Sequence, residues 1–225
     1  MRLKELLVSF IILPFALYIN SISNTNSNTN SNTNSVTDCL TITGGGYSGF
    51  WYMYSYLQRN NITKNNRKNI YCYSSSCLAY VATLMDNINS TSLYELSNKV
   101  ANDNTNININ NYEIKAKFIN IIASNVSNIQ NYNLNILTSN YLGHCIIKKP
   151  TTVSELILAL DETTNIPIIT TKLDLSKNID GWFCYALYFN NKCATTALFP
   201  HDYKFYINIL NSNMSYEDVL YFMQE

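Results

Sequence analysis

The sequence predicts an α/β fold with a central, mostly parallel sheet. Short β-rich runs alternate along the chain with longer apolar segments that have the spacing of helices. Two turns, at residues 44–49 and 72–77, each lead from a predicted strand directly into a predicted helix. In parallel sheets such turns lie together at the carboxyl edge, where ligands bind. We therefore expect residues 36–225 to form one domain with three layers: helix, sheet and helix.

Composition limits the class of protein. Of the 225 residues, 47% are hydrophobic, which is enough for one domain with a sizeable core. The formal net charge is zero and only 13% of the residues are charged. A nucleic-acid-binding protein is expected to carry a basic face, so this balance argues against nucleic acid as a partner.

The N-terminus has the pattern of a targeting segment. Arg2 and Lys4 precede an apolar run at residues 6–19, and Ser21-Ile22-Ser23 offers small residues for cleavage. We expect residues 1–23 to be a signal peptide, with an uncleaved signal anchor or a buried helix as the alternatives. Residues 24–35 contain only Asn, Thr and Ser, which predicts a disordered linker. The protein would then enter the secretory pathway and be secreted or stay anchored to the membrane.

The first half of the domain predicts strands and helices in turn. Residues 40–43 are a β-rich run into the glycines, and the nearly uncharged segment 50–58 predicts a helix that is buried on all sides. Residues 69–73 predict a second strand, and apolar spacing predicts a helix over 75–85. A short helix near Leu93 and a longer one over 112–123 follow.

The second half predicts two strands within residues 131–147 and a helix over 151–160. Thr152 can cap that helix, because Glu155 stands three residues later and closes a capping box. Ser215 opens a terminal helix in the same way, with Asp218 in its first turn. Three further apolar or alternating runs are expected to be strands, namely residues 166–171, 182–189 and 203–210.

Six cysteines occur, at positions 39, 72, 77, 145, 184 and 193. None belongs to a CxxC pair and the chain has two histidines, which argues against a zinc site. In a secreted chain, Cys184 and Cys193 are candidates for a disulfide, because Asn190-Asn191 could make a hairpin turn between them. Equally, most of these cysteines could be small buried hydrophobic residues.

The first turn, Gly44-Gly45-Gly46-Tyr47-Ser48-Gly49, formally matches the dinucleotide-binding pattern G-x-G-x-x-G. That pattern requires an acidic residue about 20 positions later, and residues 50–85 contain no Asp or Glu. The turn also lacks the Lys-Ser/Thr pair of a P-loop. A glycine turn at a helix start does expose backbone N–H groups that can hold an oxyanion.

The second turn carries a candidate nucleophile. Ser74 lies where strand 69–73 meets the following helix, and a tight strand-to-helix turn pushes a serine hydroxyl outward. Asp180, on the tight turn Asp180-Gly181, could accept the serine proton directly as a general base. A Ser-Asp-His triad through His201 is an alternative, and Ser75 or Ser76 could be the nucleophile in a shifted register.

In these motifs the chain resembles the patatin-like phospholipases, whose motifs are G-G-G-x-[RK]-G, G-x-S-x-G and D-G-[GA]. The corresponding segments are residues 44–49, 72–76 and 180–182, in the order and spacing of the family. Leu78 and Ile166-Pro167 also match its pattern. The resemblance covers most of residues 40–183. The family also has divergent members in which Cys-Tyr-Ser forms the elbow, the strand-to-helix turn that carries the nucleophile, and this chain resembles them.

The resemblance implies a lipid acyl hydrolase, of phospholipase A or esterase type, on a three-layer patatin-like fold. Ser74 would be the nucleophile and Asp180 the base of a dyad, and no cofactor or metal would be needed. The substrate would be a lipid or another acyl ester, with peripheral contact to a membrane. The oxyanion hole would come from the glycine turn, namely Gly44, Gly45, Gly46, Tyr47 and Gly49, with the N–H groups of Gly45, Gly46 and Tyr47 holding the oxygen.

Four positions depart from the family pattern. Ser48 replaces the basic residue of the glycine turn, and Cys72 and Ser76 replace both glycines around Ser74. Trp182 replaces a small residue and is expected to narrow the site. The alternative function is therefore a catalytically weak or inactive protein that binds lipid or a protein partner on the same scaffold.

Overall fold

The computed structural model describes residues 38–63, 68–86, 88–102, 111–167, 170, 174–189, 192–196, 203–211 and 213–224. The predicted signal segment 1–23 and the linker 24–35 lie outside these residues. Within the described part of the chain, no helix is both long and apolar enough to cross a bilayer.

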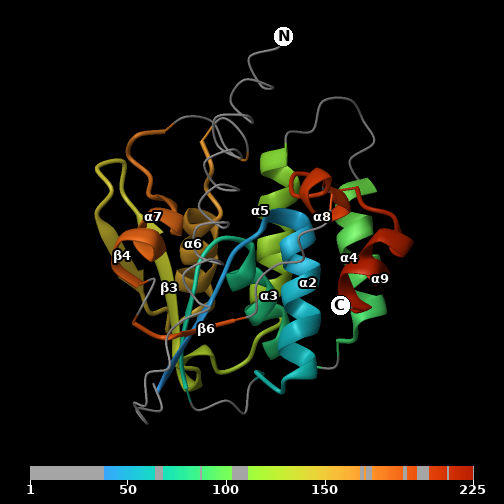
Figure 1. The fold of residues 1–225 in the computed structure, drawn as a ribbon, viewed down its shortest axis with the longest axis horizontal. Helices are drawn as coiled ribbons and strands as arrows, with labels where there is room; N and C mark the ends of the chain where they lie inside the picture. Colours follow the sequence, from blue (N-terminus) through green and yellow to red (C-terminus); the bar gives the residue numbers. More distant parts are fainter. Residues whose placement is uncertain are drawn as a thin grey trace, which may run out of the picture. The chain divides into compact units, whose positions relative to one another are not determined.

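One sheet lies at the centre of the domain (Figure 1). Its described strands are β1 (Cys39–Ile42), β2 (Asn69–Cys72), β3 (Leu134–Ser139), β4 (Cys145–Lys148), β5 (Ile179–Asp180) and β6 (Ala194–Thr195). They are arranged in the order β4-β3-β2-β1-β6, and β5 also pairs with β3. Strands β6, β1, β2 and β3 are parallel, whereas β4 and β5 are antiparallel to β3. The predicted α/β fold with a mostly parallel sheet is therefore confirmed.

The helices occupy nearly all of the predicted helical segments. They are α2 (Gly46–Arg59), α3 (Ser75–Leu84), α4 (Ser90–Asn102), α5 (Asn111–Ser124), η1 (Ile129–Asn131), α6 (Val153–Thr163), α7 (Trp182–Cys184), η2 (Tyr185–Phe189), α8 (Tyr203–Ile207) and α9 (Tyr216–Gln224). Both predicted N-caps are present, because the Thr152 hydroxyl accepts from the Glu155 N–H and the Ser215 hydroxyl from the Asp218 N–H. Helix α2 is buried on almost every side, as its lack of charge predicted.

Two predicted strands are wrong, because residues 182–189 form α7 and η2 and residues 203–207 form α8. A short apolar run does not distinguish a strand from a buried helical turn. In the first segment, Tyr185 stacks on Tyr73 at 5.1 Å between ring centroids. In the second, Phe205 packs edge-on against Tyr52 of α2 and Phe222 of α9. The third predicted strand, 166–171, lies partly outside the described residues.

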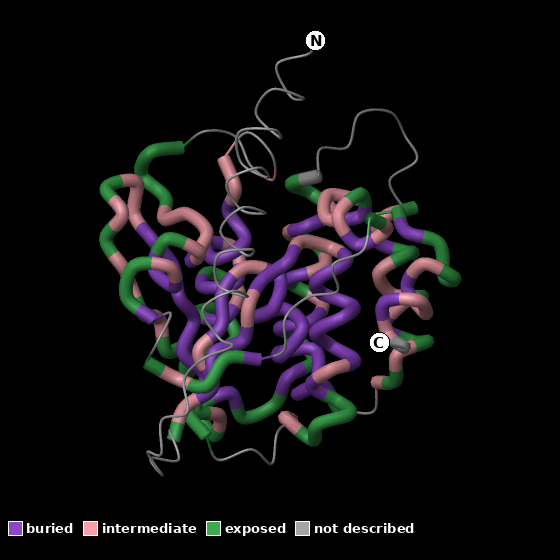
Figure 2. The backbone as a smooth tube through the Cα atoms, viewed as in Figure 1, coloured by how far each residue is buried: buried purple, intermediate pink, exposed green. Residues whose placement is uncertain are grey.

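The buried side chains form two clusters on opposite faces of the strands, since successive side chains of a strand alternate between faces. The larger cluster combines Ile42, Ile70 and Ile136 with α2, α3, α5 and α6. The smaller cluster joins Tyr73 and Leu137 to α7 and η2. In Figure 2 most of the buried backbone lies around α2, α3 and the central strands.

All six cysteines are in disulfides, which join Cys39 to Cys193, Cys72 to Cys77 and Cys145 to Cys184. The predicted Cys184–Cys193 pair is wrong. Strand β6 pairs with β1, so Cys193 reaches Cys39 at the start of β1. Helix α7 contacts β4, which brings Cys184 to Cys145.

Candidate functional site

Ser74 has an unusual backbone conformation, with φ 58° and ψ −144°. This region is almost restricted to glycine, and a non-glycine residue there costs on the order of 1–3 kcal/mol. Of the described non-glycine residues with positive φ, the other two are asparagines, Asn61 and Asn128. Asparagine adopts positive φ readily, whereas serine does so only where its surroundings impose it. The turn from β2 to α3 is therefore a strained strand-to-helix turn, as expected for a nucleophile.

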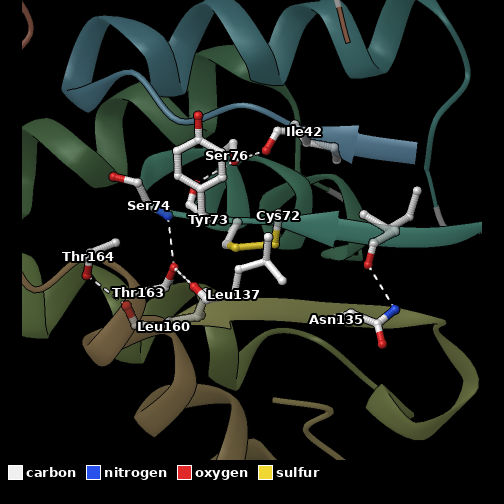
Figure 3. Close-up of a disulfide and its surroundings, with 12 residues drawn as sticks. Ile42, Cys72, Tyr73, Ser74, Ser76, Asn135, Leu137, Leu160, Thr163 and Thr164 are labelled. Carbon is white, nitrogen blue, oxygen red and sulfur yellow. Dashed lines mark hydrogen bonds between the residues drawn. A yellow bond between two sulfur atoms is a disulfide. The ribbon is translucent and has the colours of Figure 1, made fainter. Parts of the chain in front are cut away.

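Thr163, at the end of α6, helps to hold this turn. The Ser74 N–H donates to Thr163 Oγ1 over 2.9 Å, and Thr163 Oγ1 donates to the Leu137 carbonyl of β3 over 2.7 Å (Figure 3). Thr163 is fully buried. One hydroxyl therefore ties the strained residue to both the sheet and a helix.

Thr163→Val is expected to destabilise the fold by about 1–3 kcal/mol, because it leaves a buried N–H and a buried carbonyl without a partner. The change is nearly isosteric, so packing is preserved. Thr83→Val is the matched control: Thr83 is also buried, but its hydroxyl donates only to the Tyr80 carbonyl within α3. Urea unfolding of the two variants measures the difference. Equal losses of stability would contradict the special role of Thr163.

The glycine turn packs directly against Ser74. A Cβ atom on Gly44 would lie 2.6 Å from Ser74 Cβ and 2.8 Å from the Tyr73 carbonyl oxygen. Gly46 begins α2 with φ +64°, and a Cβ there would overlap the Ile209 carbonyl. Only glycine permits the close approach at position 44 and the positive φ at position 46. These contacts bring the two predicted motifs together at the carboxyl edge of β1 and β2.

The N–H groups that are predicted to hold the oxyanion differ in whether they already donate a hydrogen bond within the protein. The N–H of Gly45 donates to Ser75 Oγ over 3.1 Å. The N–H groups of Tyr47 and Gly49 donate to the carbonyls of Ile209 and Gly45, respectively. Among the described residues, no acceptor pairs with the N–H of Gly44 or Gly46. Gly46 also lines the same cavity as Ser74, so it is the best placed of the five to meet a substrate oxygen.

Asp180 comes beside the elbow through the register of β3. Cys72 of β2 pairs with Ile136, and β5 continues along the same edge of β3, where Asp180 pairs with Thr138. The Asp180 N–H is fixed by the Asn165 carbonyl over 3.0 Å. Ser74 lies two residues beyond the end of β2 and therefore faces β5, the strand that carries Asp180.

The Asp180 carboxylate has one satisfied and one unsatisfied oxygen. Oδ1 accepts from the Trp182 N–H over 2.9 Å, whereas Oδ2 is buried without a well-formed hydrogen bond among the described residues. Burial raises the pKa of Asp180 to about 6, against the opposing effects of the Ser74 hydroxyl, the Trp182 N–H and the Lys115 charge. Ser74 is thus close enough to influence the pKa of this carboxyl group. We expect Ser74 Oγ and an Asp180 carboxylate oxygen to lie about 2.6–3.2 Å apart, or a little farther apart without a ligand.

Lys115 brings a buried positive charge to the site. Its ammonium group lies 2.8 Å from Asp161 Oδ1, and its side chain is 6% exposed. Burial lowers the pKa of Lys115, and the Asp161 carboxylate opposes that change. Because its charge lowers the pKa of Asp180, Lys115 favours the ionised carboxylate.

A cavity of about 80 Å³ opens at the glycine turn and Ser74. Most of its wall is apolar and comes from α2, α3, α4 and α5 and the segment after α8. The lining residues are Gly46, Tyr47, Phe50, Trp51, Ser74, Ser75, Leu78, Ser97, Val100, Ile114, Lys115, Phe118, Thr164, Ile209 and Leu210. The lining, apolar with a few convergent polar groups, is of the kind found in small-molecule sites, although the volume is below the roughly 300–1,000 Å³ of most such sites.

The departures from the expected motifs have structural roles. Ser48 is fully buried and donates to the Phe205 carbonyl over 3.0 Å. Ser76 Oγ donates to the Ile42 and Tyr73 carbonyls over 2.8 and 2.7 Å (Figure 3). Trp182 packs against the smaller buried cluster and is not among the residues that line the cavity, whereas Trp51 and Phe118 are.

Of the two histidines, the structure describes only His144. His144 lies in the β3–β4 hairpin, where its ring contacts Asn140, and His201 lies outside the described residues. Sequence reasoning missed Thr163 and Lys115. Lys115 is one of three charged residues in the segment 112–123, with Glu113 and Lys117, and nothing local distinguishes it or Thr163. The chain matches no protein-family model and no curated protein.

Proposed function

We propose that the protein is a serine acyl hydrolase that acts on lipids or other acyl esters, on a three-layer patatin-like scaffold. The observation that carries this proposal is the backbone of Ser74, a strained non-glycine residue on a strand-to-helix turn that borders an apolar cavity. Such strain is kept where the surroundings impose it, and a catalytic nucleophile gives a reason for it.

In this mechanism Ser74 Oγ attacks the ester carbonyl carbon while its proton passes to Asp180 Oδ2, the buried oxygen that has no well-formed hydrogen bond among the described residues. The tetrahedral intermediate collapses to an acyl-serine, and the leaving alcohol takes the proton back from Asp180. Water then attacks the acyl-serine by the same route, which releases the carboxylic acid and restores Ser74. Each proton accepted by Asp180 is thus returned within its half-reaction.

The developing oxyanion would be held by the N–H of Gly46, with Gly45 as a second donor once the oxyanion displaces Ser75 Oγ. The apolar walls of the cavity would take the acyl chain. Entry into the secretory pathway and contact with a membrane surface belong to the same proposal, and three disulfides are compatible with an oxidising compartment.

Ester hydrolysis should depend on pH through Asp180. A general base must be ionised, so kcat/KM is expected to fall tenfold per pH unit below about pH 6 and to level off above it. A p-nitrophenyl ester measured from pH 4 to 8 gives this profile. Lys115→Met removes a charge that lowers the pKa of Asp180, so it should move the acidic limb to higher pH. If the acidic limb of the pH profile does not move in Lys115→Met, the titrating group is not Asp180.

A second candidate is a lipid-binding protein without catalysis. Three of the five expected oxyanion donors are already bonded within the protein, which favours weak or absent turnover. If the purified chain binds a fluorescent fatty acid in a manner sensitive to Phe118→Ala but hydrolyses no ester, this second function replaces the first.

A further inference from the structure

We propose that the Cys72–Cys77 disulfide is a positioning device that holds Ser74 in its reactive conformation. The proposal rests on the function proposed above and explains how the elbow keeps its geometry without flanking glycines. The bond joins the last residue of β2 to the first turn of α3 and spans the strained residue between them (Figure 3). The Cα atoms of the two cysteines are 5.1 Å apart.

The bond restrains the same two elements whose relative direction sets the turn. Ser74 must connect them at φ 58°, with its N–H bonded to Thr163 and its carbonyl accepting from the Cys77 N–H over 3.1 Å. A covalent link between β2 and α3 keeps the turn from relaxing into an ordinary conformation on the α3 side. Ser76 Oγ adds a non-covalent tie from α3 to the Ile42 carbonyl of β1.

The position of this bond fits local positioning better than global stabilisation. Loss of a disulfide frees more unfolded-chain entropy when the closed loop is longer. Cys72 and Cys77 are separated by 5 residues in sequence, whereas Cys39 and Cys193 are separated by 154. The long-loop bond is therefore expected to contribute more to stability, and the elbow bond more to the site.

The burial of both cysteines indicates that the disulfide is a permanent positioning device and not a redox switch. Both elbow cysteines are fully buried, so a thiolate from a reductant cannot reach either sulfur in the native fold. Native protein should keep its activity in millimolar dithiothreitol.

The test compares two pairs of substitutions, Cys72→Ala with Cys77→Ala and, as the control, Cys39→Ala with Cys193→Ala. The elbow pair is expected to lower kcat by at least about tenfold, which is about 1.4 kcal/mol, with little change in KM. The control pair should keep kcat but show the larger fall in Tm. Activity is measured below both Tm values, and Cys72→Ser with Cys77→Ser replaces the elbow pair if the alanines do not fold.

Hydrogen exchange at the Ser74 amide gives a readout that does not require activity. Its N–H is bonded to Thr163, so exchange should accelerate in the elbow pair and stay slow in the control. If exchange is faster in the elbow pair but the unsubstituted protein hydrolyses no ester, the positioning role of the disulfide is supported and the proposed hydrolase function is refuted. Unchanged exchange together with unchanged kcat would overturn the positioning role.

Discussion

Ser74→Ala is expected to abolish ester hydrolysis, with a loss of roughly 10⁴–10⁶-fold in kcat. The substitution removes the only atom that forms the covalent intermediate. It leaves the main chain intact, and the hydrogen bond to Thr163 comes from the backbone N–H. Alanine also fits the strained conformation no worse than serine, so Tm should change little. Steady-state hydrolysis of a short ester measures the effect, with circular dichroism used to compare the folded fraction of the variant with that of the unsubstituted protein.

His201→Ala is the informative companion, because it separates the dyad from a Ser-Asp-His triad. In the dyad Asp180 accepts the proton itself, so His201→Ala should keep its activity while Asp180→Asn loses it. Asparagine preserves the shape of the side chain and its acceptor for the Trp182 N–H. A folded His201→Ala variant without activity would show that the triad is correct.

Gly181→Ala is expected to cause a large structural effect at the site. A Cβ atom there would lie 2.0 Å from the Leu137 carbonyl oxygen and 2.8 Å from Tyr73 Cβ. Neither neighbour can yield alone, because Leu137 O holds Thr163 and Tyr73 precedes the nucleophile. We expect destabilisation of about 3 kcal/mol. Displacement of Asp180 by about 1 Å would add roughly a 100-fold loss of activity.

Gly143→Ala is the control for this glycine. Gly143 has φ +80° but nothing within 4 Å of its Cβ position, so the change adds backbone strain without a clash. Its cost should be about 1 kcal/mol, with activity unchanged. Chemical denaturation of both variants gives the comparison. If Gly181→Ala were as stable and active as Gly143→Ala, the close contact between the aspartate turn and the elbow would be disproved.

The parts of the fold that depend on local sequence could be predicted. The runs 40–43 and 69–73 lead into small-residue turns, and they became β1 and β2 with their helices. Thr152 and Ser215 mark helix starts because capping is a contact over three residues. The pairing of Asp180 with Thr138 of β3 is long-range, and nothing in the local sequence predicted it.

Other features of the site depend on tertiary packing and have no local signal. Thr163 ends an ordinary amphipathic helix, and its contact with Ser74 spans 89 residues. The elbow cysteines could be counted, but their pairing depends on the angle between β2 and α3. Residues 182–189 are apolar enough for a strand, and they form helical turns because Tyr185 stacks on Tyr73. Each case is decided by a partner distant in sequence.

The most direct measurement is covalent labelling of the intact chain with a fluorophosphonate probe, followed by mass spectrometry of its peptides. The probe reacts with a serine only when a base and an oxyanion site activate it. We predict a single phosphonylated residue, Ser74, with labelling lost in Asp180→Asn and kept in His201→Ala. Absence of labelling, or labelling of Ser75 or Ser76 in place of Ser74, would contradict the proposed active site.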